Sequence, residues 1–212
     1  SVWHLRVKTD WDEWDLVACF AFDEVPGAAR RELANFTLPL DRLGLDPEGR
    51  YWAYEFWDGQ FLGTTPPEEG SPGGRTNPGN YGHSGDWQDL LTHGPSGAMS
   101  LSFTGPGVKL VALRRVRTHP WVLGTSFHQS CGAELAQVAW DPSALTLSGE
   151  LHRPPGENGV IVVSAFGFEA LAPNVDGRHA PLRRGANQSL VLPLTVSGAT
   201  TRWSIRFGKC SP

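Results

Sequence analysis

Carboxylates are the residues of this sequence best suited to hydrolytic chemistry. A glycosidase needs two of them facing each other across a sugar. No spacing along the chain singles out such a pair, and most of the candidates are more typical of turn and surface charges. The candidates are Asp23, Glu24, Glu55, Asp58 and Asp86.

Two serines stand in glycine-rich segments, Ser84 within residues 82–85 and Ser96 within residues 94–97. In both segments glycine follows serine directly, whereas a nucleophile elbow needs that glycine two residues later. We therefore expect loop glycines there. With no catalytic constellation found, the sequence predicts that this chain is not itself an enzyme.

An acidic cluster near the N-terminus has oxygen ligands dense enough to hold calcium. It lacks the glycine of a calcium-binding loop, and Trp11 and Trp14 interrupt it, which favours a solvated turn flanked by anchoring tryptophans. The histidines never occur at zinc-ligand spacing, so we predict no metal site and no other cofactor. The cluster consists of Asp10, Asp12, Glu13 and Asp15.

Another group of residues has the chemistry of sugar binding. Tyr81, His83, Asp86 and Trp87 stand together, and Trp121 is a further candidate. A sugar ring needs a flat apolar face with polar groups at its edges. In the alternative interpretation, which we favour, Trp87 and Tyr81 fold back as the hydrophobic anchor of the surrounding loop.

The elements that would position these residues are strands. Residues 51–63 alternate aromatic with smaller side chains, which predicts a hairpin, and Asp58-Gly59 indicates a two-residue turn with positive φ angles. Residues 2–8 also alternate. Trp3, Leu5 and Val7 share one face there, so we expect a half-buried strand. Residues 41–45 predict a short helical turn.

The whole pattern predicts an all-β protein. We expect an antiparallel β-sandwich over about residues 1–118, followed by a second, smaller β-sandwich over about residues 119–212. Residues 64–98 are rich in glycine and proline and predict one long loop, whose segment 66–77 is expected to be exposed and cut first by trypsin, near Arg75.

Composition limits the possible partners. The net charge of −4 argues against nucleic acid, and no apolar run is long enough for a membrane-spanning helix. Three cysteines without a CxxC motif favour a reducing compartment slightly, and hence the cytoplasm. Because Ser1 leads directly into a strand pattern, we expect an excised domain or a processed product.

Five segments carry a family resemblance, and they are Tyr54–Gly63, Val111–Arg114, His119–Ser126, Val138–Asp141 and Leu145–Gly149. Together, and in the same order, they resemble the C-terminal region of α-galactosidase-like (melibiase-type) glycoside hydrolases. The resemblance spans most of residues 14–149. In that family a catalytic (β/α) barrel carries two aspartates and an antiparallel β domain follows it; the barrel's motifs match nothing here.

The resemblance implies a non-catalytic accessory domain whose partner is the catalytic barrel of the same polypeptide. The alternative is an independent carbohydrate-binding module, with carbohydrate as the partner. A supporting domain should expose an apolar patch where the barrel meets it, whereas a binding module should expose an aromatic platform.

Overall fold

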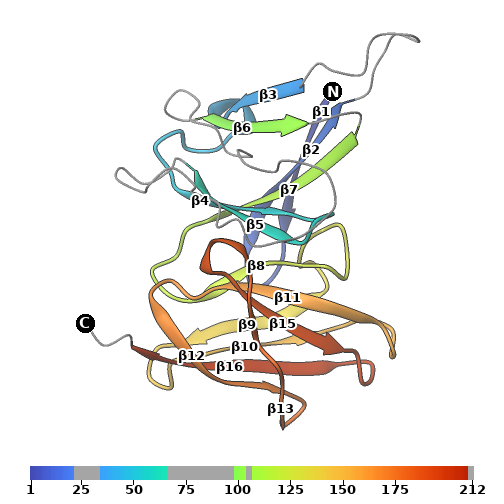
Figure 1. The fold of residues 1–212 in the computed structure, drawn as a ribbon, viewed down its shortest axis with the longest axis vertical. Coiled ribbons are helices and arrows are strands. Elements are labelled where there is room, and N and C mark those ends of the chain that lie inside the picture. The colour runs from blue at the N-terminus through green and yellow to red at the C-terminus, as the bar shows by residue number, and fades with distance from the viewer. Residues whose placement is uncertain (22–33, 66–97, 104–106, 210–212) are drawn as a thin grey trace.

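The computed structural model describes residues 1–21, 34–65, 98–103 and 107–209. These residues form an all-β structure of antiparallel sheets with two short 3-10 turns, as the sequence predicted (Figure 1). The sheets lie in layers, with β3 and β6 at one end of the molecule and β12, β13 and β16 toward the other.

The strands between residues 2 and 115 form two sheets. Sheet A has the order β1 (Val2–Lys8), β2 (Glu13–Ala21), β7 (Gly107–Arg115), β4 (Tyr51–Glu55) and β5 (Gln60–Thr65). Sheet B pairs β3 (Ala34–Pro39) with β6 (Ala98–Phe103), and the turn η1 (Asp41–Leu43) follows β3.

The strands between residues 121 and 209 form two further sheets. Sheet C has the order β14 (Arg183–Arg184), β15 (Leu190–Thr195), β11 (Asn158–Ser164) and β8 (Trp121–Thr125), with η2 (Ala186–Gln188) before β15. Sheet D has the order β13 (Arg178–His179), β12 (Phe168–Val175), β16 (Thr201–Lys209), β10 (Thr146–Leu151) and β9 (Leu135–Asp141).

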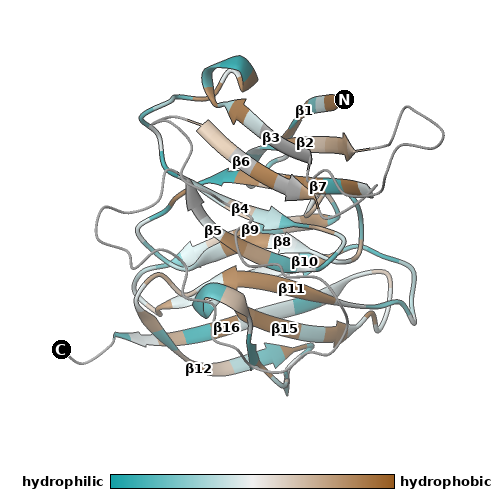
Figure 2. Cartoon of the chain, turned by 45° about the horizontal axis from the view of Figure 1, so that its top comes forward, coloured by the Kyte–Doolittle hydropathy of each residue, from teal (hydrophilic) through white to brown (hydrophobic). Residues whose placement is uncertain are grey.

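Two hydrophobic cores hold these layers together. One lies between sheets A and B and includes Val17, Leu101 and Val111. The other includes Trp14 and Tyr54 of sheet A and continues into the interior between sheets C and D. Figure 2 shows the apolar residues along the strands that form these layers. One face of sheet A therefore packs against sheet B, and the other face packs against residues 121–209.

The structure corrects two sequence-based expectations. Strand β1 does form, but Trp3 is 71% and Leu5 is 62% exposed, and of the expected buried face only Val7 is half-buried. The hairpin β4–β5 also forms, but residues 56–59 connect its strands and, of Asp58 and Gly59, only Gly59 has a positive φ, of 62°. The two-residue turn predicted there is wrong. The helical turn after residue 40 is confirmed as η1.

Several predictions lie outside the described residues. They are the trypsin site at Arg75, the serine segments 82–85 and 94–97, and the sugar-binding candidates Tyr81, His83, Asp86 and Trp87. The division into two domains near residue 119 stays a prediction.

Candidate functional site

The two faces of sheet A have different partners, because successive side chains of a strand point to opposite sides. On β2, Val17 and Cys19 face the core shared with sheet B. Trp14 and Leu16 face the core shared with residues 121–209. This second face carries the two features described below. One is the contact between sheet A and residues 121–209, which we call the junction, and the other is an exposed surface.

Arg114 of β7 lies at the centre of the junction and is 1% exposed. Its Nη1 donates to Asp12 Oδ2 over 2.8 Å, and its Nη2 donates to the Cys131 carbonyl over 2.8 Å. Its Nε donates to the Leu123 carbonyl over 3.2 Å. Burial lowers the pKa of Arg114, and the neighbouring Asp12 carboxylate opposes that effect.

Two tryptophans enclose this guanidinium. Its central carbon lies 3.7 Å from the ring centroid of Trp14 and 4.8 Å from that of Trp11. The Trp14 Nε1 donates to the Ser130 carbonyl over 2.8 Å. Trp11 and Trp14 are buried as the predicted anchors, and they anchor sheet A to the loop that follows β8. The prediction of a solvated turn is wrong for Asp12 and Asp15, whose side chains are only 5% and 6% exposed.

Trp121, the one described sugar-binding candidate, belongs to the same junction. It is buried, and its Nε1 donates to Asp12 Oδ2 over 3.0 Å. The second oxygen of Asp12 accepts a hydrogen bond from Arg117 Nη2 over 2.8 Å. The Trp121 ring thus lies inside the described structure and presents no flat face for a sugar.

Asp15 and Glu13 of the N-terminal acidic cluster also meet cations or ring nitrogens. Asp15 Oδ1 lies 2.6 Å from His4 Nε2 and 3.1 Å from Arg6 Nε. Glu13 pairs with Arg6 across 3.6 Å. Among the described residues no group of histidine, cysteine and acidic side chains could hold a metal ion. These pairs give the cluster a structural role in the β1–β2 hairpin.

The structure describes two of the five candidate catalytic carboxylates, Glu55 and Asp58, and of these Glu55 is buried. It accepts hydrogen bonds from the backbone N–H groups of Asp58 (2.7 Å) and Leu110 (3.3 Å). Burial raises its pKa, and burial lowers the pKa of Lys109 nearby. Glu55 therefore closes the β4–β5 turn. Asp58 is exposed, while Asp23, Glu24 and Asp86 lie outside the described residues.

Part of the second face of sheet A is not covered by the residues that the structure describes, and we call this part the open face. Cross-strand register places Trp3, Ala18 and Leu110 in one row, and Phe56 adjoins Leu110 through a 2.9 Å backbone hydrogen bond. Phe20 lies one step further along β2, with its ring centroid 6.4 Å from that of Trp3. All five side chains are exposed or half-buried.

In the next row along the same face, Leu5 of β1 is exposed and belongs to the open face, whereas its neighbours are covered. Leu16, Ala112 and Tyr54 lie in register beside Leu5 and are buried against residues 121–209. The open face is thus the continuation of an existing internal interface. Sequence alternation placed Trp3 and Leu5 on a face expected to be buried, because periodicity defines two faces without saying which one is covered.

No family model matches the chain, and no curated protein matches it. No helix among the described residues has the length and apolar character needed to span a membrane.

Proposed function

We propose that this chain is a non-catalytic accessory domain of an α-galactosidase-like glycoside hydrolase, and that its open face packs against the catalytic barrel of the same polypeptide. The observation that carries the proposal is the pair of exposed apolar side chains Trp3 and Leu5 on β1, which share one face of sheet A with the half-buried Leu110. Large exposed apolar surfaces of this kind are typical of protein–protein contacts.

Two further observations support a protein partner over a sugar at this face. The open face continues the interface that sheet A already makes with residues 121–209. The neighbours of Trp3 on the face are Leu5, Ala18 and Phe20, which offer no side-chain hydrogen bonds. A sugar platform needs polar groups beside the aromatic ring, so the independent carbohydrate-binding module is the weaker interpretation of this face.

The coding sequence upstream of residue 1 gives the first test. A barrel-sized stretch in the same reading frame supports the proposal, and an initiation codon at residue 1 contradicts it.

The second test uses Leu5→Asp in the whole polypeptide. If the barrel covers the open face, the charge is buried on assembly, and we expect a lower thermal midpoint and faster proteolytic separation of the two parts. In the isolated chain the same change should alter the unfolding free energy by less than about 0.5 kcal/mol, because the side chain is exposed.

Leu171→Asp is the matched control, since Leu171 is also an exposed leucine on a strand, at 50%, but lies on β12 of sheet D. Leu171→Asp should leave the thermal midpoint and the proteolytic separation of the whole polypeptide unchanged. Equal effects of the two substitutions there would contradict docking through the open face.

A further inference from the structure

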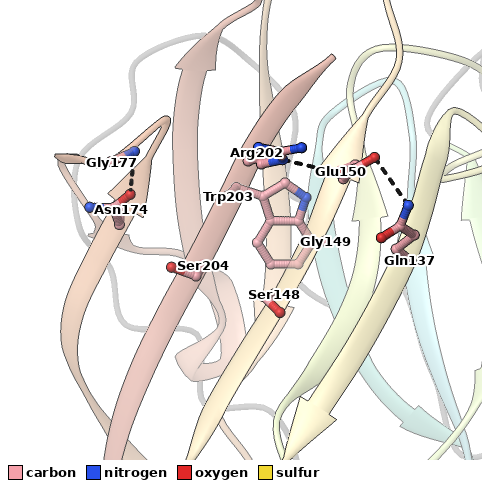
Figure 3. Close-up of a pocket in the computed structure, with 9 residues that line it drawn as sticks. All are labelled: Gln137, Ser148, Gly149, Glu150, Asn174, Gly177, Arg202, Trp203 and Ser204. Atoms are coloured by element: carbon pink, nitrogen blue, oxygen red, sulfur yellow. Dashed lines mark hydrogen bonds and ion pairs between the residues drawn. The ribbon is translucent and has the colours of Figure 1, made fainter.

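Sheet D carries a shallow dish with a cavity volume of about 380 Å³ (Figure 3). It lies on the outer side of the sheet, because Ser148 and Glu150 of β10 alternate with the buried Leu147 and Leu151. The corresponding outward residues of β16 are Arg202, Ser204 and Arg206. None of these residues takes part in the open face or the junction described above.

The hollow follows from the lengths of the side chains in register. Ser148, Ser204 and Asn174 are direct cross-strand neighbours on β10, β16 and β12. The adjacent row pairs Glu150 with Arg202. A row of short side chains beside a row of long ones leaves a depression over the middle of the sheet.

The lining is rich in hydrogen-bonding groups and has no net charge. Arg202 Nε donates to Glu150 Oε1 over 3.2 Å, and Gln137 Nε2 donates to Glu150 Oε2 over 3.4 Å. Asn174 uses its oxygen to accept the Gly177 N–H over 2.8 Å, which leaves its amide nitrogen as a donor. These interactions link the polar side chains around the rim to one another and to the β12–β13 turn.

The backbone at Gln137 is strained. Its φ is 52°, and a β-bulge interrupts the pairing of β9 with β10 next to it. Bulges often redirect a side chain beside a binding site, and residues in sparsely populated conformations gather at functional sites. Figure 3 shows the Gln137 amide turned toward Glu150 at one side of the dish.

The indole of Trp203 lies beneath this surface next to Gly149, where a Cβ would meet its ring at 2.9 Å (Figure 3). Trp203 is buried, and its Nε1 has no hydrogen-bond partner among the residues described. Its side chain belongs to the hydrophobic core beneath sheet D, because Trp203 alternates along β16 with the outward Arg202 and Ser204. Trp203 is also one of the residues that line the dish, so its indole lies close enough to report on occupancy.

We propose that this dish binds one unit of a neutral saccharide. Sugar hydroxyls both donate and accept hydrogen bonds, which matches the amides of Gln137 and Asn174 and the hydroxyls of Ser148 and Ser204. An anion would meet the Glu150 carboxylate. No exposed apolar side chain lines the dish, which disfavours an apolar ligand, and a sugar would be held there through its hydroxyl groups alone, without stacking on an aromatic ring. This inference does not rest on the proposed docking to a barrel.

The test is saturation-transfer NMR on the purified chain with the methyl α-glycosides of galactose, glucose and mannose. We expect at least one of them to give a signal and to shift the Trp203 indole N–H resonance, which Trp203→Phe assigns. Gln137→Gly should weaken that binding by roughly tenfold, the effect of about one lost hydrogen bond. Its fold should be preserved, because glycine suits a positive φ.

Gln188→Gly is the matched control. Gln188 is also a glutamine with a positive φ, of 60°, but it is exposed in η2 beside sheet C. It should leave binding unchanged, while Ser204→Tyr, which fills the dish, should abolish it. No signal from any glycoside would overturn the proposal, and so would binding that survives both Gln137→Gly and Ser204→Tyr.

Discussion

The Arg114 guanidinium is buried, and it donates hydrogen bonds to three separate segments of the chain. They end at Asp12 in the turn after β1, at Leu123 in β8 and at Cys131 in the loop that follows. Removing one member of a buried ion pair leaves the other charge uncompensated, which is far more costly than losing a surface pair.

Asp12→Ala should therefore destabilise the protein by about 3–5 kcal/mol in urea unfolding. Glu13→Ala is the control on the neighbouring carboxylate. Its side chain is 46% exposed and pairs with Arg6 and Lys8 at the surface, so the loss should be below about 1 kcal/mol. Similar losses for both variants would show that Arg114 does not depend on Asp12.

The buried thiols give a prediction on pH. Burial raises the pKa of Cys19 to about 11 and that of Cys131 to about 12, whereas an unfolded thiol titrates near about 8.5. The folded state therefore holds these protons more tightly. The stability they contribute is complete below about pH 8.5 and falls as the pH rises toward about 11.

Unfolding free energies of a Cys210→Ser protein, measured from pH 7 to pH 10.5, should show this loss. Adding Cys19→Ala should remove part of it. At pH 8 the native thiols should resist an aromatic disulfide reagent and react after denaturation. Fast labelling of the native protein would contradict the burial of both thiols.

At the scale of elements, two Asp-Gly pairs form different turns. Asp176 and Gly177 have φ values of 49° and 79° and join β12 to β13 as a tight two-residue turn. Asp58 and Gly59 belong to a longer connection, because the buried Glu55 carboxylate accepts the Asp58 N–H. An Asp-Gly pair thus indicates a turn, but the contacts of the neighbouring strand determine how many residues the turn contains.

Strand β8 also depends on a residue that only the packed structure explains. A Cβ on Gly124 would enter the ring of Tyr54 in β4. Gly124→Ala should therefore cost about 1–3 kcal/mol through overpacking. Gly198→Ala is the control, because nothing lies within 4 Å of its added Cβ, and it should be neutral or slightly stabilising. The comparison of their urea midpoints checks this, and equal midpoints would contradict it.

At the scale of the whole molecule, one hydrophobic core runs from sheet A into the interior between sheets C and D. With Arg114 buried at that boundary, we expect the described residues to unfold in a single transition. Tryptophan fluorescence and far-UV circular dichroism should then give the same urea midpoint. Two separate transitions, one per sandwich, would show that the junction contributes little to stability.

The sequence by itself determined the all-β class and most of the strands. The alternation in residues 108–116, 145–151 and 201–207 is a local property of a strand, so β7, β10 and β16 could be predicted without any partner. Strand β12 could not, because its residues 168–175 contain Pro173 and lack regular alternation. It is held by pairing with β16.

The tertiary structure decided which residues are available at the surface. Periodicity placed Trp3 and Leu5 on one face, but whether that face is covered depends on where residues 121–209 dock on sheet A. The partners of Asp12 lie more than a hundred residues away in Arg114 and Trp121. The dish likewise arises from the register of β10, β16 and β12. Such contacts join distant segments, so no local pattern in the chain reveals them.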